Sequence, residues 1–246
     1  MRPTRFWITT GLLTIWATSA AAEPVPALTP FSSATGNKMP APWHAVGLPG
    51  SQKPLTRFDL VQVDGRTVLR VLADHSYANL VHDLPDVVVP PGTQLRWRWR
   101  LDQPLPGADL RQRETDDTAL KVCLLFNAPG EQLGALEQGL LGVARALSGE
   151  KLPAATICYV WDNTLPAGTL LSNAFTARIR MIVADSGGKA LGHWVSHQQD
   201  VAADFRRAFG HEFPALPPLM GVAVGADADN TGGHSVGYVG DVTLTP

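Results

Sequence analysis

The chain lacks a long apolar run beyond its first two dozen residues, a strong charge of either sign and a phosphate-binding loop. No later stretch reaches the roughly 18 apolar residues that a membrane-spanning helix needs. The formal net charge of −2 argues against a general nucleic-acid binder. Because no glycine-rich loop follows a strand-like run, a nucleotide-dependent enzyme is not expected either.

The first residues have the three regions of a secretory signal peptide. Arg2 and Arg5 precede an apolar run, and Ala20 and Ala22 satisfy the small-x-small rule for cleavage after Ala22. We therefore expect residues 1–22 to be a signal peptide and the mature protein to be periplasmic or secreted, with no membrane span. Residues 23–42, rich in Pro, Ser and Thr, predict a flexible lead-in.

From Trp43 onward the sequence consists of short apolar runs separated by turn signals, with 23 Gly and 20 Pro in the whole chain. Asp64-Gly65, between two alternating runs, is the strongest hairpin signal. About ten such runs follow one another at the spacing of a sandwich or barrel. Residues 43–246 are thus predicted to form a single all-β domain, an antiparallel jelly-roll-like β-sandwich.

Two segments depart from this pattern and predict helices. Residues 130–149, "GEQLGALEQGLLGVARALSG", repeat leucines at helical spacing and predict one inserted amphipathic helix. Residues 202–210, "AADFRRAFG", predict a short second helix that ends at Gly210.

The segment "TQLRWRWRLD" alternates with a period of two, as a strand does. Its apolar face is made of Leu95, Trp97, Trp99 and Leu101, and its other face of Arg96, Arg98 and Arg100. The arginines have two interpretations. They hold carboxylates or sulfates of an acidic glycan, or they pair internally with Asp102, Asp109, Asp116 and Asp117, which the cost of unpaired buried charge favours.

Several ordered segments carry a resemblance to a known family. They include "LRWRWRLD", "LPAATICYVWDN", "HWVSHQQDVAADFRRAFG" and "GADADNTGGHSVGYVGDVTL". Together they resemble the exported bacterial proteins grouped as domain of unknown function 3047, over roughly residues 43–244. The resemblance implies an exported β-rich domain without an assigned activity, and Cys123 and Cys158 stand outside its shared pattern.

Those two cysteines lie in strand-like apolar runs, "LKVCLLF" and "TICYVW". Export permits a bridge between them. Two buried thiols acting as small hydrophobic side chains are the preferred interpretation, because neither spacing nor neighbours require pairing.

Carboxylates supply the candidates for catalysis. Glycoside hydrolysis needs two of them roughly 5–10 Å apart. Asp116 and Asp117 are adjacent, so on a strand they point to opposite faces, and a pair would need Asp227 or Asp229 from another strand. The stretch "GADADNTGG" also predicts a hairpin connection in which Asp227, Asp229 and Asn230 bind their own backbone. If it lies at the sandwich rim beside Asp116-Asp117, the two segments form an acidic cleft or cation site.

Two segments of the sequence are candidates for metal sites. Asp227, Asp229 and Thr231 alternate as at the start of a calcium loop, but position twelve is Tyr238 rather than Glu. A looser calcium site at Asp227 and Asp229 remains open, and otherwise no cofactor is expected. His193 and His197 would lie ~13 Å apart on a strand, too far to share zinc.

Two functions follow from these features. The first is a non-catalytic module that binds a polysaccharide or another envelope ligand, with Trp43, Trp161 or Trp194 as stacking platforms and Arg98, Asp227, Asp229 and Asn230 as polar contacts. The alternative is a carbohydrate-active hydrolase or lyase that uses Asp116 and Asp117 with the acids of the rim.

Overall fold

The computed structural model describes residues 25–48, 50–127 and 152–246. Most of the regular structure in these ranges is β-strand, as the sequence predicts. The elements are η1 (Phe31–Ser33), β1 (His44–Val46), β2 (Arg57–Val63), β3 (Arg66–Asp74), β4 (Tyr77–Val87), β5 (Gln94–Gln103), η2 (Arg113–Thr115), β6 (Thr118–Phe126), β7 (Ala155–Asp162), β8 (Leu170–Ser172), β9 (Ile179–Ser186), β10 (Val195–Asp200), α2 (Val201–Phe209), β11 (Leu219–Asp227), β12 (His234–Val239) and β13 (Thr243–Thr245).

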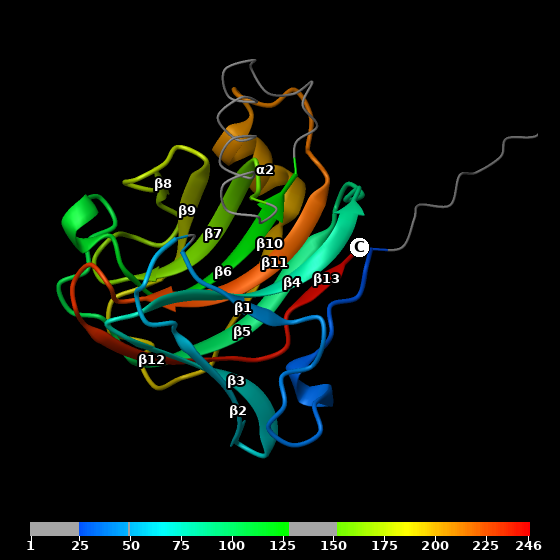
Figure 1. Cartoon of the computed structure of the whole chain (residues 1–246). Helices are drawn as coiled ribbons and strands as arrows, with labels where there is room; N and C mark the ends of the chain where they lie inside the picture. Colours follow the sequence, from blue (N-terminus) through cyan, green and yellow to red (C-terminus); the bar gives the residue numbers. More distant parts are fainter. Residues whose placement is uncertain (1–24, 49, 128–151) are drawn as a thin grey trace, which may run out of the picture.

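The strands form two sheets (Figure 1). The seven-stranded sheet has the order β1-β4-β11-β6-β7-β9-β8, and the six-stranded sheet the order β10-β5-β12-β3-β2, with β13 beside β5. One cluster of buried apolar side chains draws members from both sheets, so the sheets face each other across a common core. The predicted two-layer β architecture is confirmed at this level.

One strand pair departs from the predicted antiparallel arrangement. β7 and β9 run parallel, with Cys158 opposite Met181. Parallel neighbours need a crossover connection, and residues 163–178 supply it. Part of that connection, β8, pairs antiparallel with β9 at the edge of the sheet.

The alternation in β5 decides how the six-stranded sheet faces the core. Leu95, Trp97, Trp99 and Leu101 are buried, whereas Arg96 is exposed and Arg98 and Arg100 are half-buried. The inward and outward sorting of the twin-tryptophan segment is therefore confirmed. The β2–β3 turn is also confirmed: Asp64 and Gly65 both have positive φ, 51° and 73°, as a two-residue type I′ hairpin requires.

The short second helix is confirmed as α2. Asp200 caps its N-terminus by accepting a hydrogen bond from the Ala203 amide. Phe205 and Phe209 are buried, and the Phe205 ring contacts Phe126 at a centroid distance of 4.7 Å. The predicted inserted helix, residues 130–149, lies outside the described residues.

The described part of the predicted lead-in, residues 25–42, packs against the sandwich. Leu28 and Phe31 are buried in the common core. The Trp43 indole donates to the carbonyl of Thr29, whose amide donates to His82. Two apolar anchors thus hold a segment whose Pro, Ser and Thr content predicts flexibility. Among the described helices, none has the length and apolarity to cross a membrane.

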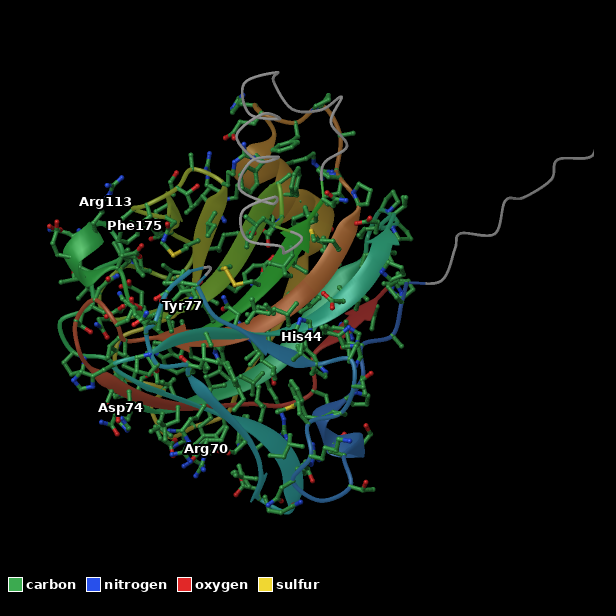
Figure 2. The ribbon with its side chains drawn as sticks, viewed as in Figure 1. His44, Arg70, Asp74, Tyr77, Arg113 and Phe175 are labelled. Atoms are coloured by element: carbon green, nitrogen blue, oxygen red, sulfur yellow. A yellow bond between two sulfur atoms is a disulfide. The ribbon has the colours of Figure 1, made fainter. Side chains whose placement is uncertain are left out.

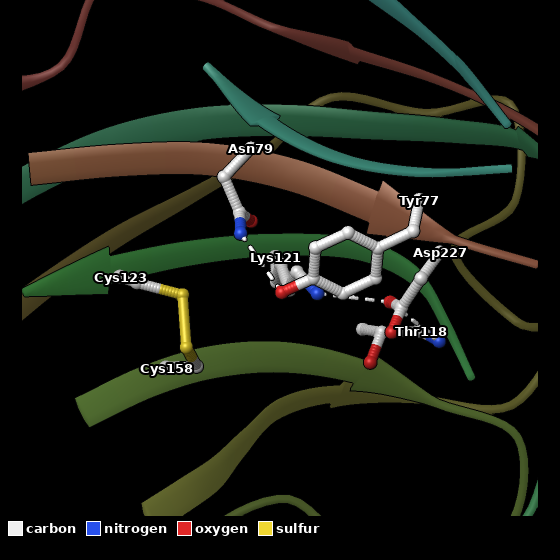
Figure 3. The surroundings of a disulfide bond; sticks show 7 residues. All are labelled: Tyr77, Asn79, Thr118, Lys121, Cys123, Cys158 and Asp227. Atoms are coloured by element: carbon white, nitrogen blue, oxygen red, sulfur yellow. Dashed lines mark hydrogen bonds and ion pairs between the residues drawn. A yellow bond between two sulfur atoms is a disulfide. The ribbon is translucent and has the colours of Figure 1, made fainter. Parts of the chain in front are cut away.

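A disulfide bond joins Cys123 and Cys158 (Figure 3). The preferred interpretation of two free thiols is thus wrong. The two cysteines lie directly opposite each other in the antiparallel β6–β7 pair. This register brings their Cα atoms to 4.0 Å, and sequence spacing alone does not reveal it.

Candidate functional site

Two regions of the described structure bring candidate residues together. The first is an acidic cluster, which we define as Asp116, Asp117, Asp227 and Asp229. The connection after β11 folds back on the residues that precede β6. The carboxylate of Asp117 accepts hydrogen bonds from the amides of Asn230 and Thr231, at 3.1 and 2.6 Å. The "DADNTGG" loop therefore lies beside Asp116-Asp117, at the rim of the sandwich.

Asp227 faces a lysine rather than open solvent (Figure 3). Its Oδ1 accepts from Lys121 Nζ at 2.9 Å and from the Thr118 amide at 3.1 Å. Both side chains of the Lys121–Asp227 pair are at most 10% exposed. Burial by itself lowers the pKa of Lys121, but the charge and hydrogen bond of Asp227, together with Tyr77 and Asp116, outweigh burial and hold that pKa above the usual range. Burial also raises the pKa of Asp227, and Lys121 offsets only part of that rise.

Asp229 completes a trio that has the donor chemistry of a cation site. One carboxylate oxygen each of Asp117, Asp227 and Asp229 lies within 4.8 Å of the others. Asp229 pairs with Lys53, and its Oδ1 is buried without a hydrogen-bond partner among the described residues. A calcium ion here would compete with Lys53 and Lys121 for the same carboxylates. Calcium binding stays a prediction of the sequence.

Asp116 has a raised pKa that brings its protonation into the range between pH 4 and 7. Burial, followed by the negative charge of Asp227, raises the pKa of Asp116 to about 6. Asn173 donates to its Oδ2. Since the folded state holds this proton more tightly than the unfolded chain, the contribution of Asp116 to stability is fully present below about pH 4. It is lost as the pH rises through about 6.

We therefore expect Asp116→Asn to become stabilising relative to the wild type as the pH rises from 4 to 7. The gain should be about 1–2 kcal/mol, after a reduction for solvent screening. The difference in melting temperature between the two proteins, followed over this pH range, measures it. If the difference in melting temperature between the two proteins does not change with pH, the pKa of Asp116 is not raised in the folded state.

The cluster does not form the two-carboxylate arrangement of a glycoside hydrolase. Asp116, Asp117 and Asp227 are each less than 10% exposed. Their oxygens accept from backbone amides, Asn173 and Lys121. A sugar must reach both carboxylates. In the described ranges, the space beside Asp117 is a small pocket next to Trp161 and Asn163, too narrow for a sugar ring.

Ser235 lies in a sequence pattern that is typical of some hydrolases. Residues 233–237, "GHSVG", match the Gly-x-Ser-x-Gly sequence of nucleophile elbows, which occur at a strand-to-helix turn. Here Ser235 lies inside β12, is fully buried, and donates to the carbonyl of Ala119. This is a strand residue with a structural hydrogen bond, so the match carries no catalytic role.

The tryptophans named as stacking platforms are differently placed. Trp43 and Trp161 are 5% and 3% exposed, and their indole nitrogens donate to the carbonyls of Thr29 and Gly187. Neither ring offers a face to a ligand. Trp161 belongs to β7, a strand whose side chains are buried on both faces.

The exposed aromatic ring near η2 is instead Phe175. It is 55% exposed, and the guanidinium of Arg113 lies 5.4 Å from its centre (Figure 2). The sequence shows no signal for this contact, because the two residues are 62 positions apart and lie outside the strands.

The second region is a groove of about 960 Å³, which we call the hairpin groove. It is lined by Gln62, Gly65, Arg66 and Thr67 of the β2–β3 hairpin and by residues of β5, β10 and β13. Gly240 and Asp241 complete the lining between β12 and β13. Such a volume is typical of small-molecule and cofactor sites. Figure 1 shows the hairpin at the end of the molecule opposite α2.

Arg98 lines this groove, and Trp194 packs against Arg98 from behind. The guanidinium of Arg98 lies 4.5 Å from the centre of the Trp194 ring. The Trp194 indole nitrogen donates to Asp64 at the hairpin tip, at 3.1 Å. Trp194 thus connects the start of β10 to the hairpin and supports Arg98 from one side. Of the predicted ligand-binding residues, Arg98 lines the groove and Trp194 stands behind it, while Asp227, Asp229 and Asn230 belong to the acidic cluster.

The arginines of β5 divide between the two interpretations of the sequence. Arg100 pairs with Asp102 through two hydrogen bonds of 2.6 and 3.0 Å. Arg96 and Arg98 form no ion pair with a described residue. Asp109 pairs with Arg111 instead, and Asp116 and Asp117 belong to the acidic cluster. Internal pairing therefore holds for Arg100 alone.

A third polar group, made of His197, Asp185 and Trp99, is not predicted by the sequence. His197 stacks on Trp97 between the sheets and contacts the carboxylate of Asp185 at 2.7 Å. Trp99 donates to the same oxygen at 2.6 Å. Alternation places His197 on the inner face of β10, but its partner on the other sheet follows only from the packing. His193 bonds instead to the carbonyl of Leu191.

Comparisons with known proteins add the following. No curated protein matches this sequence. Among solved structures, the family 11 carbohydrate-binding module of the cellulase Lic26A-Cel5E of Clostridium thermocellum is 10% identical, with a TM-score of 0.40. The match covers 87% of this chain and 96% of that one. Endoglucanase 3 of Trichoderma harzianum, from family GH12, is 8% identical over 85% and 98% of the two chains, with a TM-score of 0.38.

Structural similarity this low says nothing about the function of this chain. The comparison with protein families is more informative, because one family model matches residues 41–243, which is most of the chain. The chain belongs to the family described as protein of unknown function, DUF3047.

Proposed function

We propose that the chain is a non-catalytic saccharide-binding module whose ligand lies in the hairpin groove. The observation that carries the proposal is the groove itself, about 960 Å³ in volume and lined by hydrogen-bonding side chains. Gln62 and Thr67 come from the hairpin, and Ser196, Gln198 and Thr243 from the neighbouring strands. Hydroxyl and amide groups of this kind match the donors and acceptors of a sugar.

The alternative of a hydrolase or lyase has less support. Its candidate acids are buried and engaged, and they lie in the acidic cluster rather than along the hairpin groove. Among the residues that line the groove, the carboxylate is that of Asp241, which accepts from the amide and hydroxyl of Ser32. A single engaged carboxylate does not provide an acid and a base.

We also propose that the protein works outside the cytoplasm. The disulfide supports this compartment, since such bonds persist in oxidising environments. The signal-peptide pattern before Ala22 points in the same direction.

Gly240 offers a sharp test of the groove. A Cβ at this position would lie 2.8 Å from Cγ and Nε of Arg98. Because the atoms in the way belong to the flexible side chain of Arg98, that side chain would move while the backbone of β5 stays in place. Gly240→Ala should therefore disturb the groove without unfolding the protein. We expect it to weaken saccharide binding about tenfold, measured by affinity electrophoresis against a panel of polysaccharides.

Gly188→Ala is the matched control, because its added Cβ would make only an ordinary 3.6 Å contact with Leu191. It should bind as the wild type does. Retention of no polysaccharide by the wild type would refute the proposal, and release of reducing ends during incubation would favour the hydrolase.

A further inference from the structure

The hairpin groove contains arginines that form no ion pair within the described part of the chain. Arg66 comes from the hairpin, and Arg96 and Arg98 from β5. None of the three forms an ion pair with a described residue. Arg70 and Arg100, on the same sheet, show that the chain supplies such partners elsewhere: Arg70 pairs with Asp59 at 2.7 Å and Arg100 with Asp102 at 2.6 Å.

The acids near the groove do not compensate these charges. Both oxygens of Asp241 accept from Ser32, and Asp64 accepts from the Trp194 indole. Neither carboxylate lies within ion-pair distance of Arg66, Arg96 or Arg98. The lining of the groove therefore has an excess of positive charge, although the whole chain is slightly acidic.

Arg98 is also positioned before any ligand arrives. Trp194 lies against one side of its guanidinium, and Gly240 leaves the space that its side chain occupies. Arg96 follows the same face of β5, ~7 Å away by the strand rise. A repeated row of guanidiniums suits a linear polymer that carries a negative charge on successive units, because guanidinium binds carboxylate and sulfate through paired hydrogen bonds.

From these contacts we infer that the ligand of the hairpin groove is an anionic polysaccharide, recognised through its carboxylate or sulfate groups by Arg66, Arg96 and Arg98. The inference rests on the proposed function and specifies its ligand class. Gln198, Ser196 and Thr243 then contact the neutral hydroxyls between the charges.

The test compares polymers that differ only in charge. Polygalacturonate is paired with its fully methyl-esterified form, and dextran sulfate with dextran, while a single-stranded oligonucleotide tests for general polyanion binding. The purified protein should bind the charged member of at least one glycan pair at least tenfold more tightly than the neutral member. That affinity should fall several-fold between 50 and 200 mM salt, because screening weakens exposed charge pairs.

Variants assign the effect to the groove. Arg96→Gln and Arg98→Gln should each weaken binding of the charged polymer about tenfold or more, since each removes charge-assisted hydrogen bonds. Arg100→Gln, on the same face of the same strand but paired with Asp102, should change binding less than threefold. Arg98→Lys keeps the charge but loses the paired N–H groups of the guanidinium, so its affinity should lie between those of the wild type and Arg98→Gln. Melting temperatures show that each variant is folded.

The outcomes separate the inference from the proposed function. Equal binding of the neutral and charged polymers, insensitive to salt, overturns the anionic ligand and leaves a saccharide module. No retention of any glycan overturns the proposed function. An oligonucleotide bound as tightly as the best glycan, or an Arg100→Gln loss equal to that of Arg98→Gln, overturns recognition by these arginines.

Discussion

Replacing Lys121 by methionine should lower the free energy of unfolding by about 3–5 kcal/mol, the usual cost of removing one partner of a buried ion pair. Lys121 Nζ and Asp227 Oδ1 lie 2.9 Å apart, and both side chains are nearly excluded from water. Without the lysine, a buried carboxylate is left near Asp117 and Asp229, whose charges repel it. Urea denaturation at pH 7 measures the loss.

The double variant Lys121→Met/Asp227→Asn distinguishes a paired charge from lost packing. Because it removes both charges, we expect it to be more stable than Lys121→Met alone, by about 1–3 kcal/mol. Arg111→Met is the control. It breaks the exposed Arg111–Asp109 pair and should change stability little, as exposed pairs usually do. A loss in Lys121→Met no larger than in Arg111→Met would show that the pair is solvated.

Local features of the fold can be predicted from the sequence, whereas contacts between distant segments cannot. Alternation is a local property with a period of two, so the inward tryptophans and outward arginines of β5 could be predicted from ten residues. The hairpin at Asp64-Gly65 is equally local, since both residues adopt positive φ. The contact of Asp117 with Asn230 joins residues 113 positions apart and follows only from the strand order.

The burial of Trp161 does have a signal in the sequence. The segment that contains Trp161, "TICYVWD", is apolar without a regular polar alternation, which is typical of a strand covered on both faces. Trp194, in "HWVSHQ", has polar neighbours and is half-buried. The contacts of residues 25–42 are hidden for a different reason, because composition averages over a segment whereas Leu28 and Phe31 act as single anchors.

The groove could be predicted only in part. Arg98 was a candidate because it stands on the outward face of an amphipathic strand. Whether Arg98 forms an ion pair depends on distant acids. Asp109 pairs with Arg111 and Asp117 accepts from the Asn230 loop, so neither acid pairs with Arg96 or Arg98 in the described ranges. Charge availability on a sheet face is thus a property of the whole topology, which one strand does not reveal.

Removing the disulfide should have the second large effect on stability. The bond closes a loop of 35 residues between β6 and β7. The chain-entropy relation gives about 4 kcal/mol for a loop of this length, and measured values are typically 2–4 kcal/mol. We expect the variant Cys123→Ala/Cys158→Ala to lose about 2–4 kcal/mol in urea denaturation. Its fold should persist, because the sulfurs lie in an apolar cluster with Val160 and Met181 that alanine still fills in part.

Reduction provides the matched comparison. Dithiothreitol should lower the denaturation midpoint of the wild type toward that of the alanine variant and leave the variant unchanged, since the variant has no bond to break. Two titratable thiols in the denatured wild type, before any reductant is added, would contradict the bridge.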